Sequence, residues 1–297
     1  MLGLVKQKLD KPFRVLIYGV EGVGKTEFGA HSIDPVFLGN ESGSDAYELY
    51  RFPAPVLFSD LVRDLKRLQT EKHDRKTVVI DSLDWIEPLI FSEVVRREGK
   101  GKTIDSSHGG FDRGKVASVA LWKELLAELD ILREKKGMNV VLIAHADATK
   151  FKDPALQTDY MRFAPKLFKQ SSALIKEWVD AIMFANFVSV EDAEGKVTGS
   201  GKRYMFTEHR PGWDAKNRYS MPYKLDVRFS EFIKYAKPES VEETKRKILE
   251  LAKVLPAERL AALKIVLLDA GDDRRKINGI EATLIAEIKK LPKETGL

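Results

Sequence analysis

One run of eight residues near the start of the chain, Gly19-Val-Glu-Gly-Val-Gly-Lys-Thr26, has a composition and spacing suited to binding phosphate. It fits the pattern GxxxxGK[ST] and stands between an apolar segment, residues 13–18, and a segment that favours a helix. The three glycines allow the backbone to turn its amide groups toward phosphate oxygens. We therefore predict a phosphate-binding loop (P-loop) between a buried strand and a helix.

The loop and the residue after it supply the predicted contacts to a nucleotide. We expect Lys25 to reach the β- and γ-phosphates, in binding and in catalysis, and the Thr26 hydroxyl to bind Mg²⁺. Asp81 follows the apolar run 76–80, as in a Walker B element, and can hold a water molecule bound to the metal. ATP is preferred over GTP as the cofactor, because residues 215–218 do not fit the guanine-recognition pattern Asn-Lys-x-Asp. The residues expected to contact ATP are Gly19, Glu21, Gly22, Val23, Gly24, Lys25, Thr26 and Glu27.

Two other polar residues follow apolar runs and are expected at the same edge of a sheet. Glu41 comes just after the run 35–39, and a carboxylate there can polarise the attacking water. His145 comes just after the run 139–143 and can sense the γ-phosphate. The alternatives are a loop carboxylate or helix cap for Glu41, and a structural hydrogen-bonding residue for His145.

Apolar runs and helical patterns alternate over the first half of the chain, which indicates an α/β fold with a mainly parallel, twisted sheet and helices on both faces. Antiparallel strands at 181–190 and 203–208 are expected to extend the sheet. From residue 238 the pattern is helical again. We predict a core at 1–237 and a small helical C-terminal region at 238–297.

Composition limits the possible functions. The chain has 297 residues and no cysteine, which excludes disulfides and thiolate metal sites and fits a reducing compartment. No segment has the features of a signal peptide or a membrane span, so we expect a cytoplasmic protein with no membrane partner. Positive charge is concentrated at 150–176 (net +4) and 202–237 (net +5), while the rest of the chain sums to −4, which gives the total of +5. This clustering favours a polyanionic partner or, alternatively, a solvated surface.

The order of four segments resembles that of the RecA-like ATPases: GVEGVGKT, FLGNE, VVIDS and VLIAH. The resemblance implies a RecA-like P-loop NTPase core, with Glu41 as the catalytic carboxylate, Asp81 at the magnesium ion and His145 as the γ-phosphate sensor. RecA has a glutamine at the sensor position, so His145 departs from the pattern. Residues 12–237 look most like phage-encoded ATPases of the Sak group, which are linked to single-strand annealing.

That resemblance also implies a DNA-binding segment. RecA-like proteins carry DNA-binding loops where this chain has a basic and aromatic stretch, in which lysines and arginines can follow phosphates while aromatic rings stack on bases. The alternative is that the aromatic residues form the core face of a helix. The residues expected to bind DNA are Lys150, Lys152, Arg162, Phe163, Lys166 and Lys169.

A pair of cations is implied near the end of the core. In RecA filaments, two lysines reach the ATP of the neighbouring subunit, and Lys216 and Arg218 are the similar pair here, with Arg210 as a substitute. Such a cation neutralises charge on the γ-phosphate in the transition state. The alternative is an ordinary basic hairpin tip.

These observations predict a Mg²⁺-dependent, DNA-stimulated ATPase that acts on single-stranded DNA in phage recombination or strand annealing, in the cytoplasm of a bacterial host. The expected partners are single-stranded DNA, further copies of the chain in a ring or filament with ATP at the interface, and a single-strand-binding protein. The alternatives are a helicase- or loader-type replication ATPase and an ATP-gated binding module with little hydrolysis.

Overall fold

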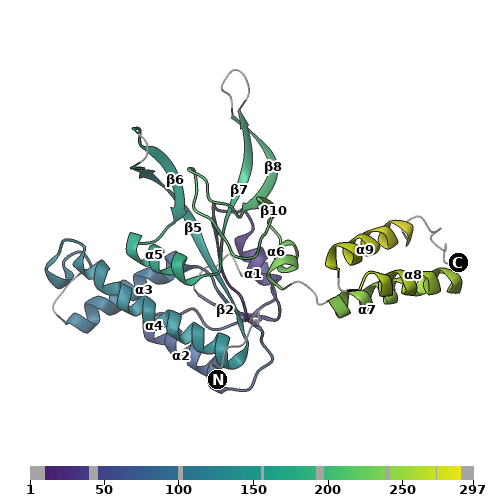
Figure 1. The fold of residues 1–297 in the computed structure, drawn as a ribbon. Helices are drawn as coiled ribbons and strands as arrows, with labels where there is room; N and C mark the ends of the chain where they lie inside the picture. Colours follow the sequence, from purple (N-terminus) through teal and green to yellow (C-terminus); the bar gives the residue numbers. More distant parts are fainter. Residues whose placement is uncertain are drawn as a thin grey trace, which may run out of the picture. The chain divides into compact units, whose positions relative to one another are not determined.

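The computed structural model describes residues 11–39, 46–99, 103–154, 157–191, 197–237, 241–271 and 273–288. The chain divides into two compact units, one ending at Ala236 and the other starting at Lys237, next to the boundary proposed from the sequence. The first unit contains a ten-stranded sheet and the helices that cover it (Figure 1).

The strands of the first unit are β1 (Arg14–Gly19), β2 (Pro35–Leu38), β3 (Tyr50–Arg51), β4 (Thr77–Ile80), β5 (Asn139–Phe151), β6 (Tyr160–Pro165), β7 (Ala181–Glu191), β8 (Val197–Phe206), β9 (Lys216–Asn217) and β10 (Lys224–Asp226). Its helices are α1 (Lys25–Ala30), α2 (Phe58–Thr70), α3 (Leu83–Glu98), α4 (Arg113–Lys136), α5 (Lys169–Trp178) and α6 (Phe229–Ala236), with a 3₁₀ turn, η2, at Ser107–Gly109.

The central strands are parallel, as predicted. The order across the sheet is β10-β8-β7-β1-β5-β4-β2-β3, and every neighbouring pair from β7 to β3 is parallel. Strand β5 therefore separates the P-loop strand β1 from β4, and the pairing of Gly19 with His145 aligns the carboxyl ends of β1 and β5. Parallel strands covered on both faces must be apolar on both sides, which explains the unbroken apolar runs in the sequence.

Alternate side chains of β1 belong to two different cores, as the two-residue period of a strand requires. Leu16 and Tyr18 pack with helices α2, α3, α4 and α5 on one face. Val15 and Ile17 pack on the other face, with α1 and α6. The sheet is thus the middle layer of three, as the sequence predicts (Figure 1).

Two antiparallel hairpins extend from the carboxyl edge of the parallel strands (Figure 1). The β7–β8 hairpin corresponds to the predicted antiparallel extension. In the other hairpin, β5 continues past His145 to Phe151 and turns back as β6, with Ala146 opposite Pro165. Residues 160–165 are therefore a strand, and the alternative interpretation of this stretch as a helix is wrong.

The second unit consists of α7 (Val241–Leu251), the 3₁₀ turn η3 (Ala252–Val254), α8 (Ala257–Asp269) and α9 (Arg274–Ile288). These helices share a core of their own that includes Ile248, Leu267 and Leu284. Within the residues described, no helix of the chain has the length and apolar character needed to cross a membrane.

The packing of α6 predicts a large stability difference between two phenylalanine truncations. Phe232 is 0% exposed, and its ring centroid lies 5.1 Å from that of Phe13, the residue before β1. We expect Phe232→Ala to lower the free energy of unfolding by about 3–5 kcal/mol. Phe111 is 93% exposed, so Phe111→Ala should change the free energy of unfolding by less than about 0.5 kcal/mol. Urea unfolding followed by circular dichroism measures both, and equal losses would contradict the role of α6 in the core.

Candidate functional site

The P-loop follows β1 at the carboxyl edge of the sheet, as predicted. Gly24 has φ +104°, a left-handed conformation that side chains disfavour, and α1 begins at the next residue. Lys25 is 5% exposed, and its ammonium group donates hydrogen bonds across the loop to the Gly19 carbonyl (3.1 Å) and the Val20 carbonyl (2.9 Å). The loop is therefore folded around the lysine that is expected to meet the phosphates.

Thr26 and Asp81 face each other beside this loop. The Thr26 hydroxyl donates a hydrogen bond of 2.8 Å to Asp81 Oδ2, and Asp81 is 2% exposed. Because β4 is buried along its whole length, Asp81 is delivered to the carboxyl edge of the sheet directly after Ile80. A hydroxyl and a carboxylate in contact are oxygen ligands of the kind that Mg²⁺ prefers. These two residues fit the metal that accompanies ATP, and bound there it would neutralise charge on the phosphates.

The sensor candidate His145 forms a half-buried pair with Asp84, a residue that the sequence did not indicate. Asp84 Oδ2 lies 2.8 Å from His145 Nδ1, and Asp84 Oδ1 accepts a 2.9 Å bond from the His145 amide. Burial opposes the charged form of Asp84, but the hydrogen bonds and charge of His145 outweigh it and lower the pKa of this carboxyl. His145 lies between the P-loop and Asp81, because β5 lies between β1 and β4.

The other candidates at this edge differ in what the structure shows. Glu41 lies outside the described residues, so its role as the catalytic carboxylate stays a prediction; the strand before it, β2, ends at Leu38 beside β4. Arg203, which sequence reasoning missed, comes from β8 onto the P-loop. Its guanidinium pairs with Glu27 at 2.8 Å and donates to the Val23 carbonyl at 3.3 Å. Nothing local in the sequence signals this contact.

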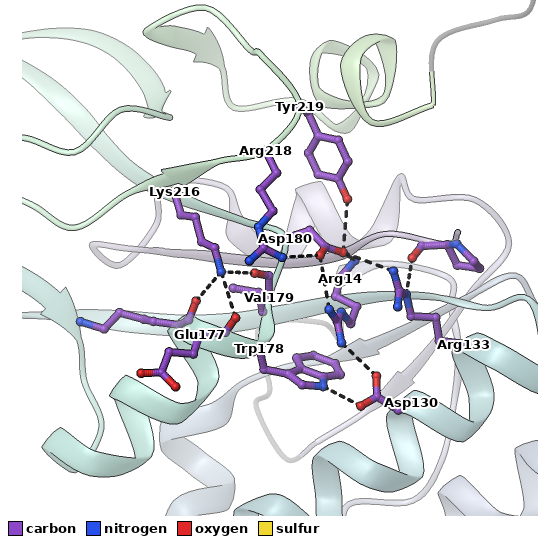
Figure 2. Close-up of polar contacts among 12 residues, drawn as sticks. Arg14, Asp130, Arg133, Glu177, Trp178, Val179, Asp180, Lys216, Arg218 and Tyr219 are labelled. Carbon is purple, nitrogen blue, oxygen red and sulfur yellow. Dashed lines mark hydrogen bonds and ion pairs between the residues drawn. The ribbon is translucent and has the colours of Figure 1, made fainter. Parts of the chain in front are cut away.

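Lys216 and Arg218, the predicted cations in trans, have structural contacts within the chain (Figure 2). The Lys216 ammonium donates to three carbonyls at the end of α5, those of Lys176, Glu177 and Val179, at 2.6–3.0 Å. Burial lowers the pKa of Lys216, as does the nearby charge of Arg218. A cation at the C-terminus of a helix satisfies its last carbonyls.

Arg218 pairs with Asp180 at 3.2 Å, and Asp180 also contacts Arg14, Arg133 and Tyr219 (Figure 2). Asp180 precedes β7, at the edge opposite the P-loop, since β7 and β1 are parallel. These contacts give no support to a role of Lys216 and Arg218 at a phosphate. Arg210, the substitute, pairs with Glu208 at 3.6 Å.

The predicted DNA-binding residues separate into two groups. Arg162 is 9% exposed and is held by the Pro211 carbonyl (2.9 Å), by Asp214 (3.6 Å) and by the ring of Phe151 (3.7 Å). Phe163 stacks on Phe184 at 5.1 Å. Both side chains thus have partners within the chain, and their assignment to a DNA-binding surface stays a prediction.

The four predicted lysines line, together with Arg162, an accessible groove of about 1060 Å³, which we call the hairpin groove. Its walls are α3, the β5–β6 hairpin and the start of α5, and it opens onto Glu21 of the P-loop and onto His145. Within the described part of the chain, no ion pair involves Lys152, Lys166 or Lys169, whereas Lys150 pairs with Asp159 at 3.0 Å. The groove lysines are Lys150, Lys152, Lys166 and Lys169.

The floor of the hairpin groove contains a buried carboxylate. Glu87 of α3 accepts hydrogen bonds of 3.0 and 3.2 Å from the Phe168 amide, just before α5. Burial raises the pKa of Glu87, and the hydrogen bonds it accepts only partly oppose that effect. The start of α5 is thereby tied to α3.

A parallel sheet with a P-loop after β1, and an aspartate facing the P-loop threonine, defines a P-loop NTPase. Residues 11–219 match a family model described as an AAA domain. The match covers most of the chain, which therefore belongs to this family of P-loop ATPases. A comparison with curated proteins found no match.

The Thr26–Asp81 contact predicts how magnesium affects nucleotide binding. We expect Asp81→Asn to keep the shape of the buried side chain. The factor by which Mg²⁺ raises the affinity for ATP should fall about tenfold, because the carboxylate charge is gone. Titrations of a fluorescent ATP analogue with and without Mg²⁺ measure this difference. Asp226→Asn, on the distant strand β10, is the control. An unchanged Mg²⁺ effect in Asp81→Asn would contradict the assignment.

The cluster around Asp180 predicts a loss of stability rather than of nucleotide binding. Asp180→Ala leaves three arginines facing each other without their shared carboxylate, and we expect the free energy of unfolding to fall by about 3 kcal/mol. Asp74→Ala removes a carboxylate that is 83% exposed and should cost less than about 1 kcal/mol. Urea denaturation compares the two variants; similar costs would disprove a structural role for the cluster.

Proposed function

We propose that this P-loop ATPase is Mg²⁺-dependent and binds single-stranded DNA in the hairpin groove, so that DNA stimulates hydrolysis. The observation that carries the proposal is the continuity of β5. Strand β5 leaves the parallel sheet at His145, beside the P-loop, and continues directly into the hairpin that carries Lys150 and Lys152. A nucleic acid lying on these lysines would therefore contact β5, the neighbour of the P-loop strand β1 in the sheet.

We assign the roles in hydrolysis as follows, with support from the contacts of the site. Lys25 and the loop amides bind the phosphates, and Thr26 and Asp81 hold the magnesium ion that accompanies ATP. His145, held by Asp84 and paired with Gly19 across the sheet, is our proposed γ-phosphate sensor. Glu41 remains our proposed residue for polarising the attacking water.

The pathway and the assembly rest on the resemblance to the Sak group. It supports strand annealing or recombination in phage, a homo-oligomer with ATP at its interfaces, and a single-strand-binding protein as a partner. Gel filtration with and without ATP tests the oligomer directly.

Steady-state ATP hydrolysis with and without single-stranded DNA tests the proposal. We expect stimulation by DNA in the wild-type chain and no hydrolysis in Lys25→Ala, which loses its contact with the β- and γ-phosphates. If DNA does not change the rate of hydrolysis, the ATPase assignment would stand, but a motor or switch that acts on another partner would be favoured over a DNA-stimulated ATPase.

Reversal of charge in the hairpin groove tests the location of the DNA. The double variant Lys166→Glu with Lys169→Glu should weaken binding of an oligo-dT by at least tenfold. The slope of log K against log salt should become shallower by about 0.7 for each phosphate contact that is lost. The control, Lys135→Glu with Lys136→Glu, makes the same charge change at the exposed end of α4. Fluorescence anisotropy of labelled oligo-dT measures both, and equal weakening would place the DNA elsewhere.

A further inference from the structure

An exposed tryptophan lines the hairpin groove together with the lysines. Trp85 is 52% exposed, although it stands in the first turn of α3 next to the buried Ile86. Pro88 and Phe91 follow it at three-residue spacing and line the same groove, so α3 presents an apolar strip there. A contiguous apolar strip left exposed along a groove is the kind of surface that a ligand covers.

The chemistry of the groove identifies this ligand. Lysines of the hairpin and of α5 can hold phosphates, whereas the strip on α3 is apolar and aromatic. The two carboxylates of α3 that also line the groove, Asp84 and Glu87, are bound to His145 and to the Phe168 amide. A polymer with anionic groups on one side and flat apolar rings on the other matches both walls, and unpaired nucleic acid has this form. In a duplex the bases are already stacked and paired, so their faces are not available to Trp85.

We infer that Trp85 is a stacking site for an unpaired base of single-stranded DNA, an inference that rests on the proposed function. Its position also links the base to the nucleotide site. Trp85 directly follows Asp84, which holds His145 through two hydrogen bonds at the end of β5. The base-contacting residue and the partner of the sensor are thus neighbours in one helical turn.

Binding of oligo-dT and of an abasic oligonucleotide of the same length, measured by anisotropy in the full chain, tests the inference. We expect Trp85→Ala to weaken binding of oligo-dT by about tenfold and to leave binding of the abasic strand unchanged, since only the base contact is lost. Trp85→Phe keeps a ring and should recover most of the affinity. Tyr50→Ala, which removes another exposed aromatic ring at the β3 edge, should bind like the wild type.

Tryptophan fluorescence gives a second, independent readout. Oligo-dT should quench the wild-type emission, the abasic strand should not, and Trp85→Phe should lose the quenching although it still binds. Wild-type affinity of Trp85→Ala for oligo-dT, or quenching by ATP alone, would overturn the stacking site while leaving the lysine assignment standing. If the wild-type chain binds neither oligonucleotide, the proposed function fails and the stacking site fails with it.

Discussion

The position of β5 between β1 and β4 is the constraint on which the candidate site depends. Because these strands are parallel and in register, their carboxyl ends bring the P-loop, His145 and Asp81 to one edge. The same strand does not stop there but continues into the β5–β6 hairpin. The topology therefore joins the nucleotide site and the hairpin groove through a single strand, and no separate connecting element is needed.

Helix α3 fixes both ends of that hairpin. It begins two residues after Asp81, and Asp84 in its first turn binds the amide and the ring of His145. One turn later, Glu87 accepts from the Phe168 amide, where the chain leaves the hairpin. Carboxylates on one helix face thus hold the start and the end of the hairpin.

The sequence was sufficient to predict the central strands and the P-loop because their signals are local: apolar runs, glycine spacing and a Lys-Thr pair. The basic residues could not be sorted in the same way. Arg162 and Arg218 look like their exposed neighbours in the sequence, but they are paired with Asp214 and Asp180, dozens of positions away. A local count of charge does not reveal such partners. Trp85 was not predicted to be exposed, because an aromatic residue in a helix normally indicates a core position.

The P-loop itself is held by two cations from different parts of the fold. Lys25 donates to the carbonyls of Gly19 and Val20, and Arg203 donates to the carbonyl of Val23 while pairing with Glu27. These contacts fix the loop at both ends, and a loop held in shape by its own protein loses less binding energy to ordering. The β7–β8 hairpin, which supplies Arg203, therefore supports the P-loop from one side of β1, and the β5–β6 hairpin flanks the other side.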